Sequence, residues 1–467
     1  MRVALPALGA IGLLLGGCSG VDHDAAFSGV RTIASERLGV QDLRWDHGTP
    51  ADTATRDAVA RLLESPLTAD STVQIALLNN RHLQASYEEL GIAQADLVQA
   101  GLLENPSFSS DILIGNDAVS PSFRVVQNII SIVTRSSRRT VASSAFEQTK
   151  LETSQKVLDL AAEVRSAYYT VVADGQAIDL FRQVVSGSEA AAELSERQAR
   201  AGNINRRDRS LQQAQYAQAV LELARVEAQA AGDREALTRL LGLSGDQVGW
   251  NIPGKLPDIP AEKPSFEELE KLAIERRLDL AGARQGFQAA TYALELGRQL
   301  RFLSALGLGV SVVRDPDSGH WLKGPSIELT LPIFDQGQAK IASLESQRRR
   351  EENIFVALAV DARSEVREAW MRLIAAQEAA MFYQTRMLPL QQQIVEETNR
   401  LYNGNLIGIY DLLKSRQDQI AGARDYIGAV KDYWLARSDL EKAIAGPLPG
   451  ASTAAVPAHP HTFARGS

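Results

Sequence analysis

The sequence predicts a mainly helical protein with a small β part, built from a unit of helix, β-hairpin, long helix and helix that occurs twice. The first observation is a helix-spaced stretch from about Gln338 to Arg400 that contains one proline, Pro389, near its far end. About sixty residues at about 1.5 Å each reach roughly 90 Å, whereas globular helices average about a dozen residues. The second observation is two pairs of short alternating runs, and the third is the recurrence of similar residues at a fixed offset.

Composition narrows the function classes. The chain has 467 residues and a net charge of −8, which argues against a nucleic-acid-binding surface because phosphates require a basic face. No apolar run of about eighteen residues follows the N-terminus, so no transmembrane helix is predicted. If the chain crosses a membrane, it must do so with strands.

The N-terminus has the form of a signal peptide over residues 1–17, ending in small residues before Cys18. Small residues followed by cysteine resemble the bacterial lipoprotein box, so we expect Cys18 to be lipidated and to begin the mature chain. Ser19, rather than Asp, then implies sorting to the outer membrane. An acyl chain anchors a protein without spanning the bilayer. The alternative is an ordinary signal peptide that contains the only cysteine of the chain.

The first half is expected to begin with a lipid-anchored tether over 18–70, extended except for one short helix near 52–64. The first repeat covers 71–242, with Asp70 and Ser71 as candidate N-caps and Gly242 as a C-cap. Asn105-Pro106 ends its first helix. Its predicted elements are helix 71–100, strands 107–115 and 122–133, helix 136–200 and helix 205–241.

The second half repeats this plan after a linker over 243–264 that contains four prolines. The second repeat covers 265–446, and residues 447–467 form a Pro/Ala/Gly-rich tail that we expect to be disordered. Its predicted elements are helix 265–301, strands 304–314 and 321–333, helix 338–400 and a return helix ending near 445.

The duplication can be checked residue by residue. Residues 163–168 match 365–370, and Gly202-Asn203 matches Gly404-Asn405, all at an offset of 202; Gln215 and Gln417 also fit that offset. Residues 76–83 match 273–280 at an offset of 197. The five-residue difference must lie between these helices, so the hairpins differ in length while the long helices keep their register.

The second-half strands alternate with a period of two, and each has about ten residues, the length of a tilted transmembrane strand. The first-half strands are less regular, because Val125, Ile129 and Val133 fall on one face but Val126, Ile130 and Ile132 on the other. Two soluble hairpins remain an alternative, although the chain offers no second layer to cover them. Four strands cannot close a membrane barrel, so spanning strands would require several chains to share one barrel. The second-half apolar positions are Leu306, Leu308, Val310, Val312, Ile327, Leu329, Leu331 and Ile333.

The helices are rich in alanine with larger apolar residues at spacings of three and four, which favours close, coiled-coil-like packing side by side. The alternative is an ordinary long coiled coil, as in a structural protein. The strands, the lipoprotein box and the duplication count against it.

With these features, the chain resembles the TolC-like outer-membrane efflux proteins, in particular the lipid-anchored members of tripartite pumps. The resemblance covers about 71–446 together with the anchor. The motifs that carry it are Leu331–Gly337 at the strand-to-helix junction, Asn105-Pro106, the pairs Ala167-Tyr168 and Ala369-Trp370, and the turns Ala201–Asn203 and Tyr402–Gly404.

The resemblance implies a homotrimer in the outer membrane, with a twelve-stranded β-barrel that continues into a long α-helical barrel in the periplasm. It would be a passive conduit of a tripartite efflux or type I-like export system, working with a periplasmic adaptor and an inner-membrane transporter. It would not be an enzyme and would need no cofactor. A different class remains open: a periplasmic, lipid-anchored coiled-coil scaffold without channel activity.

The resemblance places a periplasmic gate at the turns 200–208 and 402–411. Its candidate residues are Arg206, Arg207, Asp208, Tyr402 and Asp411. The alternative is helix-end chemistry, because an acid near a helix start is favoured by about 0.3–1 kcal/mol. The offset of 202 pairs Asp411 with Arg209 instead of Asp208, so we expect the two turns to present their acids differently.

Other candidate residues carry less weight. Glu328 lies on the polar side of its strand and is a candidate lumen residue or a solvated one. The first-half junction near 132–137 lacks the Pro and Gly of 331–337, so we expect the two junctions to differ in shape. His459 and His461 in the tail are expected to be incidental, and no residue set indicates catalysis or a metal site.

Overall fold

The structure is a computed structural model that describes residues 23–40, 42–50, 52–114, 119–301, 306–315 and 317–449. Cys18 and the predicted tail lie outside these ranges, apart from 447–449. The chain divides into two compact units. The first comprises Met1–Ile33, Ala85–Ser154 and Leu278–Leu358, and the second comprises Ala34–Gln84, Gln155–Arg277 and Ala359–Ser467.

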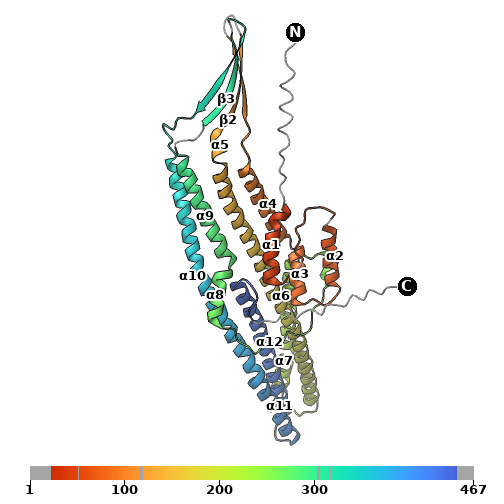
Figure 1. Ribbon diagram of the computed structural model, residues 1–467. Coiled ribbons are helices and arrows are strands. Elements are labelled where there is room, and N and C mark those ends of the chain that lie inside the picture. The colour runs from red at the N-terminus through yellow and green to blue at the C-terminus, as the bar shows by residue number, and fades with distance from the viewer. Residues whose placement is uncertain are drawn as a thin grey trace, which may run out of the picture. The chain divides into compact units, whose positions relative to one another are not determined.

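The strands of both halves form one antiparallel sheet in the first unit (Figure 1). Its order is β1-β2-β3-β4, so the two hairpins join through β2 and β3. The chain is thus mainly helical with a small sheet, as the sequence predicts. The strands are β1 Ser107–Ile114, β2 Val119–Asn128, β3 Leu306–Arg314 and β4 Trp321–Leu329.

Two predicted strands are too long, and the first error has a clear cause. β2 ends at Asn128, whose side-chain Oδ1 accepts hydrogen bonds from the backbone N–H groups of Ile130 and Ser131 at 3.0 and 3.3 Å. This cap begins helix α5, Ile129–Val133. The irregular alternation of the first half therefore arises where strand spacing gives way to helical spacing. β4 ends at Leu329, and residues 330–337 form the junction to the next helix.

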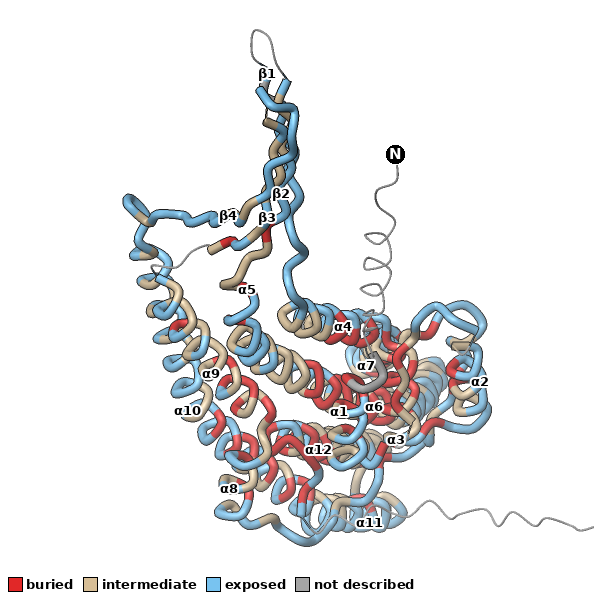
Figure 2. The backbone as a smooth tube through the Cα atoms, turned by 45° about the horizontal axis from the view of Figure 1, so that its top comes forward, coloured by how far each residue is buried: buried red, intermediate tan, exposed pale blue. Residues whose placement is uncertain are grey.

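The sheet has one apolar and one polar face. Residues that face each other across strands share a side of the sheet, and the register aligns Phe108 with Val125, Val125 with Val310, and Val310 with Pro325. Most residues of the apolar face are exposed, whereas most of those on the opposite face are half-buried or buried (Figure 2). The large apolar members of the apolar face are Phe108, Ile112, Ile114, Val119, Phe123, Val125, Leu306, Leu308, Val310, Val312, Trp321, Ile327 and Leu329. Its polar members are Ser110, Gln127, Arg314 and Lys323.

The opposite face carries small and polar residues, with Val126, Val313 and Leu322 as apolar members. Its other members are Ser107, Ser109, Asp111, Ser120, Ser122, Arg124, Asn128, Gly307, Gly309, Ser311, Gly324, Ser326 and Glu328.

Two glycines on this polar face allow β2 and β3 to approach closely. A Cβ atom on Gly309 would lie 2.1 Å from the carbonyl oxygen of Val125, and one on Gly307 would lie 2.5 Å from Cγ1 of Val126. Any side chain at Gly309 would therefore collide with backbone. A Cβ atom on Gly324, on the same face of β4, would meet nothing within 4 Å.

The remaining elements of the first unit are helical segments that precede and follow the sheet (Figure 1). α9, Leu278–Gln299, packs against α6, Arg135–Arg200, where a Cβ on Gly286 would lie 2.9 Å from Gln148 Oε1. α10, Gln338–Phe382, is held to α9 by an ion pair between Arg298 and Glu345 at 2.7 Å. Through these contacts, α9 joins the helices α6 and α10, which follow the two hairpins.

The two strand-to-helix junctions differ in shape, as expected. Gly337 precedes α10 with φ +75°, and its N–H donates to Asp335 Oδ1 at 2.8 Å. Glycine adopts this left-handed conformation without steric cost. The first half uses α5 at the corresponding place instead.

The segment 18–70 is not an extended tether over its described part. It contains α1, His23–Leu38, in addition to α2, Asp52–Leu63, which matches the predicted short helix. Phe27 of α1 is buried against Tyr87 of α4, Arg81–Gly101, with ring centroids 4.8 Å apart. The weak periodicity of the sequence concealed α1.

Both helices that open the repeats are broken, which corrects the predictions of single helices over 71–100 and 265–301. The first becomes α3, Ala69–Asn79, and α4; the second becomes α8, Phe266–Arg276, and α9. The breaks fall at Asn80 and Arg277, which are related by the offset of 197 found in the sequence. The duplication therefore preserves the break.

The cap of α3 also differs from the prediction, because Thr68 occupies the N-cap position. Ser71 N–H donates to Thr68 Oγ1 at 3.1 Å, while Thr68 N–H donates to Ser71 Oγ at 2.8 Å. This reciprocal pair is a capping box.

The proline-rich linker is an ordered strap in the second unit. Trp434 Nε1 donates to the carbonyl of Pro257 at 3.0 Å, Gln377 Nε2 to Pro260 at 2.7 Å, and Trp370 Nε1 to Pro264 at 3.0 Å. Carbonyls of an extended proline-rich segment have no partners of their own, and these side chains supply them. The linker is thereby fixed to α10 and to α12, Ile409–Ala443.

The second long helix differs from the first by a π-helical turn, Tyr383–Met387, between α10 and α11, Leu388–Asn403. The N–H of Leu388 donates to Tyr383 O, five residues back, and Pro389 in the next turn has no N–H to donate. A π turn accommodates an extra residue within a helix. The predicted helix 338–400 therefore exists, but with this interruption.

That turn changes the offset between the halves from 202 to 203 in the second unit. Before it, buried Val366 and Leu373 correspond to buried Val164 and Val171 at 202. After the π turn, residues with the same backbone conformation or burial in the two halves are related by an offset of 203; these residues lie at the turns and in α7, Arg206–Leu241, and α12. The pairs are Gly202 with Asn405, Gln212 with Ser415, Leu237 with Leu440, and Gly242 with Ala445. The match of Gln215 with Gln417 is therefore accidental.

Replacement of Gly309 by alanine is expected to disrupt the β2–β3 pairing, because the new methyl group would displace the Val125 backbone. Such overpacking costs about 1–3 kcal/mol or more. We expect a lower thermal unfolding midpoint and faster proteolysis of the strands in the detergent-purified protein. Gly324→Ala is the matched control, and an equal loss in both variants would contradict this account of the sheet.

Candidate functional site

The helix-to-helix turns, where the gate was predicted, have the same backbone design. Gly202 has φ +76°, and Asn203 N–H donates to Gln198 O at 2.9 Å. In the second turn Asn405 has φ +57°, and Leu406 N–H donates to Leu401 O at 2.9 Å. Both are Schellman motifs that end a long helix. The left-handed residue of the second turn is thus Asn405 and not Gly404.

The two gate aspartates occupy the same position in their helices, which the offset of 202 does not predict, but they have different hydrogen-bond partners, as expected. Asp208 is the third residue of α7, whose N-cap is Asn205, and Asp411 is the third residue of α12, whose N-cap is Gly408. Asp208 Oδ2 accepts from Asn205 Nδ2 at 2.8 Å. Asp411 Oδ2 accepts from the N–H of Gly408 at 3.2 Å. Both acids therefore stabilise helix starts.

The remaining predicted gate residues are only partly engaged. Arg207 pairs with Asp208 at 3.7 Å and is largely exposed. For Arg206 and Tyr402, no side-chain hydrogen bond or ion pair occurs within the described ranges. Among the predicted gate residues, Arg207 and Asp208 therefore contact each other, while Arg206 and Tyr402 lie at the turns without such a contact.

Sequence reasoning missed the side chain that joins the two turns. Tyr410 OH donates to Gln198 Oε1 at 2.8 Å, which ties the start of α12 to the end of α6. Desolvation and then the charge of Asp208 raise the pKa of Tyr410. Arg209, also not predicted, pairs with Glu196 at 3.7 Å. Tyr410 is the second residue of α12. No sequence pattern at this position predicts a hydrogen bond to a residue of another helix.

Glu328 lies on the polar face of the sheet, as its alternation predicts. It is opposite Gly307 in the register and is exposed. Asp111 and Arg124 are the other charged residues of that face in the described strands. The face therefore carries both signs of charge.

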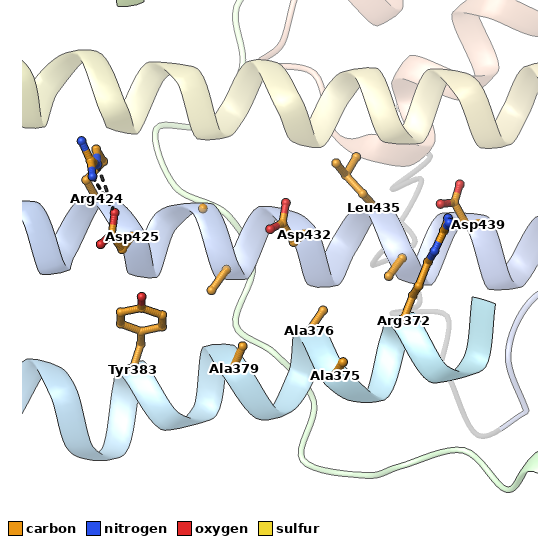
Figure 3. A pocket seen from close by; sticks show the side chains of 13 residues that line it. Arg372, Ala375, Ala376, Ala379, Tyr383, Arg424, Asp425, Asp432, Leu435 and Asp439 are labelled. Atoms are coloured by element: carbon orange, nitrogen blue, oxygen red, sulfur yellow. Dashed lines mark hydrogen bonds and ion pairs between the residues drawn. The ribbon is translucent and has the colours of Figure 1, made fainter. Parts of the chain in front are cut away.

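A groove of about 810 Å³ runs between α10 and α12 in the second unit (Figure 3). Its floor is made of small residues that include Ala375, Ala376 and Ala379. Arg424 and Asp425 form an ion pair at 2.8 Å near the Tyr383 end. The sequence did not predict this surface, because alanine at helical spacing indicates close packing between helices and not an open groove.

A carboxylate pair lies between α6 and α7 in the same unit. Burial, and then the nearby charge of Asp233, raise the pKa of Asp174 to about 6, while Lys431 acts in the opposite direction. Asp174 Oδ2 is buried without a hydrogen-bond partner. The charged form of Asp174 is therefore unfavourable in the folded state.

Among the helices in the described part of the chain, none combines the length and the hydropathy required of a membrane span. Within the same ranges, no cluster of three or more His, Cys, Asp or Glu side chains could hold a metal ion.

Loss of the Tyr410 hydroxyl is expected to loosen the contact between the two turns. A net hydrogen bond contributes about 0.5–1.5 kcal/mol, so Tyr410→Phe should accelerate amide hydrogen exchange in 198–205 and 409–413 about two- to tenfold. Tyr402→Phe is the matched control and should leave exchange unchanged. Equal protection in the wild type and in Tyr410→Phe would show that the bond does not couple the turns.

Asp174→Asn is expected to stabilise the protein at high pH. Because the folded pKa lies above the usual 3.8, the folded state binds more protons than the unfolded state between about pH 4 and 6. The penalty is fully present above pH 6 and disappears as the pH falls. After allowance for solvent screening, we expect a gain of about 1 kcal/mol, or about 2–4 °C in the unfolding midpoint, at pH 8.

The same substitution should have little effect at pH 4, where the native carboxyl is already neutral. Asp179→Asn, on the exposed side of α6, is the control in both buffers. A gain that is independent of pH would assign the effect to something other than the charge of Asp174.

The comparisons with known proteins agree with this architecture. Residues 72–243 match the outer membrane efflux protein family. The cobalt-zinc-cadmium resistance protein CzcC of Cupriavidus metallidurans is 23% identical over 384 residues, which cover 81% of this chain and 90% of that protein.

Solved structures show the same fold at low identity. The outer-membrane channel OprN has a TM-score of 0.68 at 16% identity, covering 83% of this chain and 92% of that chain. The outer membrane protein VceC of Vibrio cholerae has a TM-score of 0.66 at 15% identity, covering 85% and 97%. The chain therefore has the fold of these solved outer-membrane proteins, and its first repeat matches the outer membrane efflux protein family.

Proposed function

We propose that this protein is the outer-membrane channel of a tripartite efflux system, a passive conduit that does no covalent chemistry. The observation that carries the proposal is the four-stranded sheet, which has one apolar face, one polar face and two unpaired edges within the described chain. The match of residues 72–243 to the outer membrane efflux protein family supports an efflux role in general. The trimer, the barrel and the partners described next belong to the proposal.

Closure of the sheet explains the assembly. The backbone groups on the free edges of β1 and β4 cannot remain unpaired in lipid. Because the order β1-β2-β3-β4 is antiparallel throughout, β4 of one chain can pair with β1 of the next in the same antiparallel sense. Three chains then give a closed barrel of about twelve strands, within the range of known membrane barrels. The apolar face would meet lipid and the polar face would line the lumen.

The helices would continue this conduit through the periplasm to an adaptor and an inner-membrane transporter. Lipidated Cys18 would add an anchor in the outer membrane. The turns would form the gate, where Arg206, Arg207, Asp208, Tyr402 and Asp411 remain candidates. Tyr410 joins this set because it already links α12 to α6.

The cargo is a further part of the proposal. CzcC is named for resistance to cobalt, zinc and cadmium. We assign the choice of cargo to the inner-membrane transporter, since the described residues contain no metal cluster that would select an ion.

The alternative of a lipid-anchored coiled-coil scaffold is tested by the two faces of β3. Val310 lies on the apolar face and is 56% exposed, whereas Ser311 next to it lies on the polar face. A lysine at mid-depth on a lipid-facing strand costs about 2–4 kcal/mol per chain. Val310→Lys should therefore abolish assembly in the membrane, while Ser311→Lys should preserve a heat-modifiable trimer and its conductance in planar bilayers.

The scaffold alternative predicts a different pattern. Both variants would then behave alike, and the wild-type protein freed of its lipid would be a water-soluble chain without conductance. Either result would reject the channel.

A further inference from the structure

We propose that Arg124 sets the charge preference of the channel by placing a ring of unpaired positive charge in its lumen, which lowers the permeability to small cations. This inference rests on the proposed function, since the ring forms only when three chains share one barrel. Arg124 is not one of the candidate gate residues, and the family match gives it no role.

The register places Arg124 among small neutral neighbours on the polar face. It is opposite Ser109 of β1 and Ser311 of β3, and Ser311 in turn is opposite Gly324 of β4. Its side chain is exposed. The guanidinium therefore extends over a surface of glycine and serine, which leaves it free to reach toward the axis of the barrel.

No acid neutralises Arg124 within the described strands. Asp111 lies one register step away on the same face, but it accepts a hydrogen bond from Ser122 at 3.5 Å and forms no ion pair with Arg124. Glu328 lies opposite Gly307, farther toward the helices. Among the described residues of the polar face, Arg124 is the sole basic side chain.

The charges consequently lie in separate layers. From the helical end outward, the polar face carries Glu328, then Arg124, then Asp111. In the proposed trimer each layer would contain three like charges. Without Arg124 the face would hold only acids, and a cation would meet no repulsive layer in the strand region.

The dimensions make such a ring effective. Twelve strands about 4.8 Å apart and tilted by about 40° give a backbone radius of about 12 Å. An arginine side chain extends about 6 Å inward, which leaves about 6 Å to the axis. This distance is shorter than the Debye length of about 8 Å at physiological ionic strength, so salt does not fully screen the ring.

The test is the reversal potential of the reconstituted channel in a KCl gradient. For Arg124→Gln we expect the ratio of potassium to chloride permeability to rise about fivefold, because three screened charges of one sign are removed. Glu328→Gln should lower the ratio. Arg124→Lys keeps the charge and should retain the wild-type ratio.

Lys323→Gln is the matched control, because Lys323 is opposite Val312 and lies on the apolar face next to Gly324. The same loss of a positive charge there should leave the ratio unchanged. If Arg124→Gln does not assemble, Ser311→Glu places a carboxylate beside Arg124 and should raise the ratio in the same direction.

The outcomes separate the two proposals. A conducting trimer whose ratio changes less than twofold in Arg124→Gln, or in Ser311→Glu where the former does not assemble, overturns the role of Arg124 and leaves the channel intact. A wild-type protein that forms no conducting channel overturns the proposed function itself. A shift of similar size in Lys323→Gln would also reject the role of Arg124, because it would show that charge on either face acts alike.

Discussion

The structure depends on the hydrogen-bonding requirement of the backbone at the two free edges of the sheet. Within the described chain, β1 and β4 each pair on one side only. An apolar face with such edges is unstable in water as an aggregation surface and costly in lipid as a row of unpaired polar groups. A closed assembly removes both problems at once. The glycines at 307 and 309 allow β2 and β3 to pair closely, which joins the two hairpins into one sheet.

The second unit solves a different problem, which is to hold long helices together with few large side chains. Its linker strap uses indole and amide N–H groups from α10 and α12 to satisfy three proline carbonyls. Each of these part-buried hydrogen bonds is expected to contribute about 0.5–1.5 kcal/mol. The strap therefore fixes helices that alanine-rich packing alone would leave free to slide. Trp370 and Trp434 thus have a structural role at these contacts.

The sequence predicted those elements whose residues follow a regular or duplicated pattern. Strand alternation fixed the two faces of the sheet, and the duplicated pattern located the long helices and their turns. It failed where regular spacing is interrupted. The side chain of Asn128 ends β2 and starts α5, and the breaks at Asn80 and Arg277 divide helices whose periodicity continues across them. At the candidate gate, position along the chain was predictable but equivalence was not, because one helical turn holds an extra residue. The Tyr410 contact depends on how two helices meet, which no local pattern reports.

The π turn at Tyr383–Met387 has a consequence for the history of the chain. One codon added inside a regular helix would rotate everything beyond it by about 100° and move buried residues to the surface. Confinement of the added residue to a wider turn cancels that rotation, so the downstream half of the duplicated segment stays in phase with its ancestor. Pro389, which has no N–H, lies in the turn that follows the widening. The second copy thus contains one more residue than the first, while Asp411, like Asp208, remains the third residue of its helix.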